Sequence, residues 1–177
     1  NLDTSKYGSI AEIGGGQEVA REFFLAGGAS GTIAKTISAY DKTFSDHLYN
    51  QGQSGRYVSL NRLEKMLEAE YNELVKLLND KRNDKLRFFS FANTVEILNY
   101  RKSNQGHGWL GMKFELTTPG QPNEVVIHVR LLENDSAQQQ FTLGTLGVNL
   151  IYACFYYHHD PNVFLQSLLD NLDFDRV

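Results

Sequence analysis

The chain has 177 residues, which is the size of one ordinary domain and is long enough to bury an apolar core without a metal or disulfides. Its residues are 41% hydrophobic and 21% charged, and a chain of that composition is neither disordered nor collagen-like. The net charge is −4 and no basic face is evident, which argues against nucleic acid and anionic membranes as partners.

The N-terminal half predicts a strand, a helix, a second strand and a longer helix. Residues 9–13 form a short apolar strand, 17–27 a helix with one apolar face, and 31–40 a strand rich in β-branched residues. A right-handed connection between neighbouring strands would start a parallel α/β arrangement. Residues 60–78 repeat leucine at helical spacing, and Ser59 is the expected cap of this helix.

The C-terminal half predicts three strands and two helices. The strands are expected at 85–92, 109–116 and 124–132. Residues 117–123 contain two prolines and a glycine, which suits the loop of an antiparallel hairpin. Ser136 is the expected cap of an apolar helix, and Pro161 starts the last amphipathic helix.

These elements predict a single domain of the α/β class, or of the α+β class, over residues 1–177. We expect a mixed sheet of about five strands, with an N-terminal strand-helix-strand unit, a later antiparallel hairpin and packed helices. The uncharged run 141–157 is too short for a membrane span and predicts a buried core helix. The single cysteine, Cys154, lies in that run, which favours a reducing compartment and a cytoplasmic protein.

The first candidate ligand site is a glycine-rich turn. Gly14, Gly15 and Gly16 stand between the first strand and its helix, where backbone N–H groups can meet a phosphate at a positive helix end. The stretch does not complete G-x-G-x-x-G, because Val19 occupies the last glycine position. It also partly resembles the glycine motif of methyltransferases that use S-adenosylmethionine, with Glu18 replacing a glycine. A tight turn without a ligand is the alternative.

The second candidate loop is "GGASGTIAKT" at 27–36, which offers two hydroxyls and a lysine to an anion. Ala29 and Ala34 stand where a Walker motif needs glycines, so ATP hydrolysis by that route is not predicted. We expect both loops to meet at one sheet edge, with Asp41 accepting hydrogen bonds from a ribose. The predicted ligand-binding residues are Gly14, Gly15, Gly16, Gly28, Ser30, Gly31, Thr32, Lys35 and Asp41.

The histidines are the candidates for chemistry. His107 lies between glycines beside Trp109, where it is either a general acid or base or part of a surface turn. His158 and His159 are adjacent at a helix end, and they point in different directions, so no metal site is predicted. The sequence assembles no nucleophile, base and acid, and it leaves open whether the protein is an enzyme.

Five segments, "GSIAEIGGGQEVAREFF", "GGASGTIAKTISAYD", "GHGWLG", "IHVRLLEND" and "LGVNLIYACFYYH", carry a resemblance over almost the whole chain. Together they resemble the N-terminal part of a family of longer bacterial proteins of uncertain role, which implies a longer parent protein. Members of that family carry two conflicting labels, nicotinate-nucleotide adenylyltransferase and TonB-dependent receptor. This chain lacks the H-x-G-H signature of the first and is too short for the second.

The leading hypothesis is therefore a cytoplasmic domain that binds a nucleotide or another phosphate-bearing ligand through the two glycine-rich loops. One alternative is a non-catalytic interaction or homo-oligomerisation module that uses the aromatic strand or the apolar C-terminal helices. The other is an enzyme with His107 as its acid or base.

Overall fold

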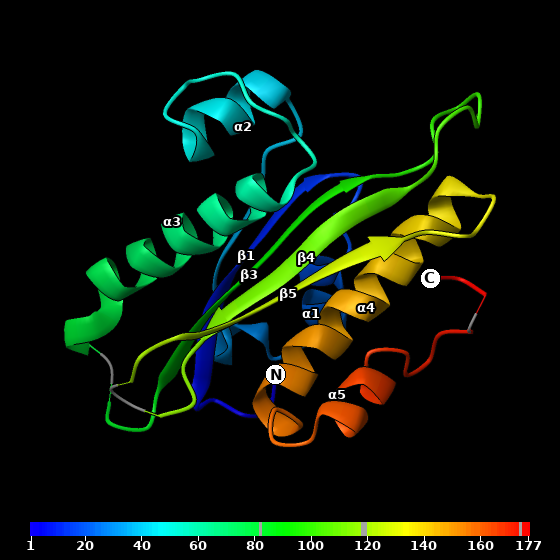
Figure 1. The fold of residues 1–177 in the computed structure, drawn as a ribbon. Helices are drawn as coiled ribbons and strands as arrows, with labels where there is room; N and C mark the ends of the chain where they lie inside the picture. Colours follow the sequence, from blue (N-terminus) through cyan, green and yellow to red (C-terminus); the bar gives the residue numbers. More distant parts are fainter. Residues whose placement is uncertain (82, 118–119, 174) are drawn as a thin grey trace.

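The computed structural model describes residues 1–81, 83–117, 120–173 and 175–177, which form one mixed sheet with helices on both faces (Figure 1). The strands are β1 (Lys6–Gly14), β2 (Ile33–Ser38), β3 (Arg87–Glu96), β4 (His107–Phe114) and β5 (Asn123–Arg130). The helices are α1 (Val19–Ala26), α2 (Lys42–Tyr49), α3 (Leu60–Leu78), α4 (Ser136–Tyr156) and α5 (Pro161–Ser167), with 3₁₀ turns at Ala29–Gly31 and Asn79–Lys81. The predicted α/β fold is confirmed.

The strand order is β2-β1-β3-β4-β5, with β1 parallel to both of its neighbours. Strands β3, β4 and β5 are antiparallel to one another in turn, which confirms the predicted hairpin. The loop predicted for that hairpin includes residues 118–119, which lie outside the described residues. From β1 the chain reaches β2 on one side and then β3 on the other, so the strand order reverses direction at β1.

The two faces of the sheet are covered by different helices (Figure 1). Helix α3 packs on β1, β3 and β4, whereas α1 and α4 pack together on the opposite face, where α5 joins α4. Alternation along β4 explains this, because Leu110, Met112 and Phe114 enter the core under α4 while Gly111 lies against leucines of α3. The largest core cluster lies between the sheet and α4.

Local sequence explains most of the helix ends. The Ser59 side chain accepts a 3.2 Å hydrogen bond from the Arg62 amide, as predicted for the cap of α3. Asp135, not Ser136, caps α4, because its carboxylate reaches the backbone amides of both Ala137 and Gln138. Helix α2 was not predicted.

Helix α4 is the buried core helix that the sequence predicts. Cys154 is fully buried within it, and burial raises the pKa of its thiol to about 12, so the side chain acts as a small apolar group. Pro161 begins α5, as predicted, after the Asp160 cap. None of the helices in the described parts of the chain combines the length and apolar character of a membrane span.

Candidate functional site

The polar candidate site is a cleft of about 980 Å³ at the carboxyl ends of β1 and β3. Gly14 and Gly15 border it where β1 ends, and Tyr40 borders it after β2. Ligands of open α/β sheets bind at this kind of position, where neighbouring connections leave in opposite directions. The topology therefore places one of the two predicted loops at the expected edge of the sheet.

A smaller hollow of about 400 Å³ adjoins this cleft over β4 and β5. Arg56, Val58 and His107 line both cavities, so the two form one continuous site. The hollow adds Trp109 from β4, Arg130 and His128 from β5, and the start of α3. Strand pairing places these side chains on one face, because His107 lies opposite Arg130 and Trp109 opposite His128.

Two histidines form the floor of the hollow. Nε2 of His128 lies 3.4 Å from Nδ1 of His107, and the Trp109 ring centroid lies 4.5 Å from that of His128. Burial, with the nearby His107 and Arg130, lowers the pKa of His128 below its ordinary value. A carboxylate oxygen of Glu96 is 3.9 Å from Nε2 of His107.

The two arginines of this site are not neutralised by ion pairs. Within the described parts of the chain, no carboxylate lies within ion-pair distance of Arg56 or Arg130, and both arginines are exposed. Two exposed guanidinium groups and two histidines that line one hollow favour an anion over a cation. Sequence reasoning missed both arginines and did not bring His128 near His107, since the hollow draws on three distant segments.

The expected cradle of backbone amides at α1 is already occupied. The carboxylate of Glu12, 3% exposed, accepts hydrogen bonds of 3.1 Å from the amides of Val19 and Ala20. The Gly15 amide donates to the carbonyl of Val95 at 2.9 Å. These amides cannot also bind an external anion, so the positive end of α1 serves an internal carboxylate. Burial raises the pKa of Glu12 to about 7, although these hydrogen bonds and one from Asn93 oppose the rise.

The expected meeting of the two glycine-rich loops is wrong. Gly8 lies opposite Ile33, so the loop before β2 lies at the amino ends of the strands. Gly14 lies at the carboxyl end of β1, and the six residues from Gly8 to Gly14 span about 20 Å of extended strand. Within that loop, Thr32 donates a 2.7 Å hydrogen bond to the side chain of Asn1. The members of this loop that do not reach the cleft are Gly28, Ser30, Gly31, Thr32 and Lys35.

Three of the predicted residues have structural roles. The ammonium of Lys35 lies 2.6 Å from Glu70 and also pairs with Glu73, both on α3. Asp41 caps α2 by accepting a 2.9 Å hydrogen bond from the Phe44 amide, and it does not line the cleft. A Cβ at Gly16 would lie 2.8 Å from the Asn93 side chain, so that glycine permits close packing of the turn.

The site contains no assembled catalytic set. The Ser59 hydroxyl, which borders the hollow, caps α3 and donates a 3.2 Å hydrogen bond to the Arg56 carbonyl. In the parts of the chain that the structure describes, no cluster of three or more His, Cys, Asp or Glu side chains could hold a metal ion. His158 and His159 lie in the turn after α4, far along the chain from this site.

Comparison with known proteins finds similarity at the level of the fold. Neither family models nor curated sequences match the chain. A competence/damage inducible protein, CihA from Agrobacterium tumefaciens, is 16% identical, with a TM-score of 0.56 over 84% of this chain and 85% of that chain. A CinA superfamily protein of Klebsiella pneumoniae is 12% identical, with a TM-score of 0.49 over 84% of this chain and 89% of that chain. The CihA structure shows that a similar fold occurs in a known protein.

Proposed function

We propose that this domain binds a phosphate-bearing small molecule of the nucleotide type in the joined cleft and hollow. The observation that carries the proposal is the group of Arg56, Arg130, His107 and His128, whose two arginines have no ion-pair partner among the described residues. Planar guanidinium groups bind phosphate oxygens through two parallel hydrogen bonds. The glycine-rich loops of the sequence also predicted a phosphate-bearing ligand. In the present proposal, side chains bind the phosphate in place of the backbone amides of those loops.

Aromatic side chains along the cleft support a nucleotide over inorganic phosphate. Tyr40 is 76% exposed and Tyr100 is fully exposed, and both border the cleft. Exposed aromatic rings stack with nucleobases, which contributes about 1–3 kcal/mol per base in single-stranded complexes. The proposed arrangement places the phosphate in the hollow beside Arg56 and the base between the tyrosines.

Binding fits the geometry better than catalysis does. The Ser59 hydroxyl is engaged as a helix cap, and Cys154 is buried away from the cleft. His107 and Glu96 remain as an acid–base pair for a reaction in which water is the nucleophile. We place the domain in the cytoplasm, where its free cysteine stays reduced, and within a longer parent protein.

Isothermal titration with ATP, NAD and inorganic phosphate tests this proposal, and S-adenosylmethionine, a nucleoside derivative without a phosphate group, is the comparison ligand. We expect at least one nucleotide to bind, and Arg56→Ala to weaken its binding about tenfold to a hundredfold, as expected for loss of hydrogen bonds to a charged group. Arg21→Ala is the matched control, because Arg21 is an exposed arginine that lies on α1. Absence of heat and of thermal stabilisation with ATP, NAD and phosphate would overturn the proposal, as would equal binding by the two arginine variants.

Self-association is the second candidate function. Four large apolar side chains on the packed helices α1 and α4 are half or more exposed: Phe24, Leu25, Phe141 and Tyr152. Exposed aromatic groups at this density favour a protein interface. Light scattering over a range of concentrations tests this, with Leu25→Glu expected to shift a dimer to the monomer mass.

A further inference from the structure

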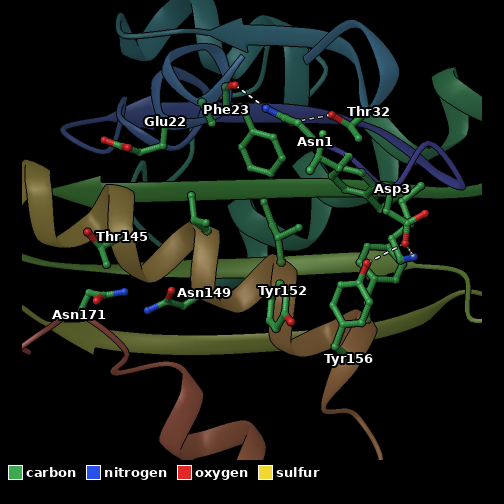
Figure 2. A pocket seen from close by; sticks show the side chains of 17 residues that line it. Asn1, Asp3, Glu22, Phe23, Thr32, Thr145, Asn149, Tyr152, Tyr156 and Asn171 are labelled. Atoms are coloured by element: carbon green, nitrogen blue, oxygen red, sulfur yellow. Dashed lines mark hydrogen bonds and ion pairs between the residues drawn. The ribbon is translucent and has the colours of Figure 1, made fainter. Parts of the chain in front are cut away.

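A second cavity, of about 640 Å³, lies on the opposite face of the sheet from the hollow, between the N-terminal segment, α1 and α4 (Figure 2). Phe89 of β3 and Phe155 of α4 form part of its floor. Their rings pack edge to face, with the ring centroids 5.8 Å apart. Phe23 and Tyr152 line it from opposite sides in Figure 2. A cavity of this size with aromatic walls and a few polar groups has the properties of a small-molecule site.

Packing of the two helices explains why the cavity exists. Helices α1 and α4 approach closely at Gly144 and Gly147, where an added Cβ would meet Glu18 and Val19 within 3 Å. Further along α4, Val148, Tyr152 and Tyr156 follow on the side that faces the cavity. The close glycine contact thus gives way to a space bordered by larger side chains.

At one end of the cavity, the charged side chains are paired with each other. Lys6 forms an ion pair with Asp3, and its ammonium lies 4.9 Å from the ring centroid of Tyr156. The Tyr156 hydroxyl donates a 2.7 Å hydrogen bond to the same Asp3 carboxylate. These bonds hold the pKa of Asp3 far below its usual value. This end therefore offers no spare charge to a ligand.

The other end carries an unpaired negative charge. Figure 2 shows Glu22 at the same end as Thr145 and Asn171. Across the described ranges of the chain, no lysine, arginine or histidine lies within ion-pair distance of the Glu22 carboxylate, and the residue is half-buried. A carboxylate at the rim of an aromatic cavity attracts a cation, because the carboxylate is negatively charged and the faces of the rings carry partial negative charge.

We propose that this cavity binds an organic amine, a small molecule with an apolar or aromatic body and a protonated amino group. The body lies between Phe23 and Tyr152 over the Phe89 floor, and the ammonium group pairs with Glu22. The site is independent of the phosphate cleft, because the two cavities share no lining residue. Failure of either proposal leaves the other intact.

Titration with three probes of equal length tests the proposal: 4-phenylbutylamine, 4-phenylbutanol and 4-phenylbutanoate. We expect the amine to bind most tightly and the carboxylate most weakly. Glu22→Gln should weaken amine binding about two- to fivefold, as for a partly exposed ion pair, and leave the alcohol unchanged. Glu64→Gln, which removes an exposed carboxylate from α3, is the charge-matched control.

A second variant separates the cavity from the helix surface. Ala26 is exposed at the end of α1 and lines the cavity, so Ala26→Trp should block it without disturbing the core. We expect this variant to lose both amine and alcohol binding at a native melting temperature. The proposal is overturned if no probe binds, if the amine has no advantage over the alcohol, or if Ala26→Trp binds normally. It is also overturned if light scattering shows that the wild type is a dimer and the probes bind only to the monomeric Leu25→Glu variant.

Discussion

The carboxylate of Glu12 accepts a 2.9 Å hydrogen bond from the side-chain amide of Asn93, and this bond links β1 to β3 inside the core. The same carboxylate also binds the first amides of α1. One buried acid therefore joins two strands and a helix, two residues before Gly14, which borders the candidate cleft.

The free energy of unfolding should fall as the pH rises, because Glu12 loses its proton. The pKa of Glu12 is about 7 in the folded protein against a reference of 4.5, so between these values the folded state holds a proton that the unfolded state releases. The free energy of unfolding should decrease by about 2–4 kcal/mol across this window and level off about one pH unit above the folded-state pKa. Urea unfolding from pH 4 to pH 8 measures the effect.

Glu12→Gln removes the titrating group and keeps its shape. We expect the difference between wild type and this variant to vary with pH from 4.5 to 7, whereas Asp3 titrates at lower pH in both proteins. Parallel pH profiles for the two proteins would show that Glu12 does not titrate in this range.

Lys35 should contribute to stability and not to ligand binding. It pairs with the buried Glu70, so Lys35→Met should cost about 1–2 kcal/mol, less than for a fully buried pair because Lys35 is partly exposed. Lys76→Met, on the exposed side of α3, should have little effect. Urea unfolding gives the stabilities. A lysine that binds the cleft ligand would instead lower nucleotide affinity when replaced.

The contact between α1 and α4 should not tolerate a methyl group. A Cβ at Gly147 would lie 2.3 Å from Val19 and 3.0 Å from Phe91, so Gly147→Ala should destabilise the protein by about 1–3 kcal/mol. Adding Val19→Ala should recover part of that loss, because it removes the atom that clashes. Thermal unfolding of the two single variants and the double variant measures the coupling. Additive losses would contradict this packing.

The histidine pair should respond to an anion. NMR titration should give His128 a pKa below the ordinary histidine value, and phosphate-bearing ligand should raise it by stabilising the imidazolium. His107→Asn should also raise it, since His107 is one cause of the lowering. His47→Asn, on α2, is the control. An ordinary pKa in the wild type, or a curve unmoved by ligand, would contradict the proposed anion site.

The fold was predictable because most elements bury apolar side chains, whereas the short helix α2 buries Ser45 and Asp46 beside Tyr49. Its eight residues mix polar and aromatic side chains, and tertiary contacts with α3 stabilise it. Asp41 was assigned to a ribose, although an aspartate just before a helix is also a typical cap, which is its observed role.

The site was only partly predictable. Because β1 and β2 are parallel, the start of β2 lies at the amino ends of the strands and the end of β1 lies at their carboxyl ends. The two loops therefore could not meet. Gly14 and Gly15 lie where β1 ends and border the cleft. Arg56 and Arg130 carried no local sequence signal, because strand pairing and the path of the 51–59 segment bring them together.

The outer strands of the sheet have a consequence for how copies of the protein could associate. Strand β2 carries Lys35, and β5 carries Glu124 and Arg130. Charges on a border strand disfavour alignment of a foreign backbone along it, which limits cross-β aggregation. Contact between molecules is therefore expected through helical surfaces rather than through extension of the sheet from one molecule to the next.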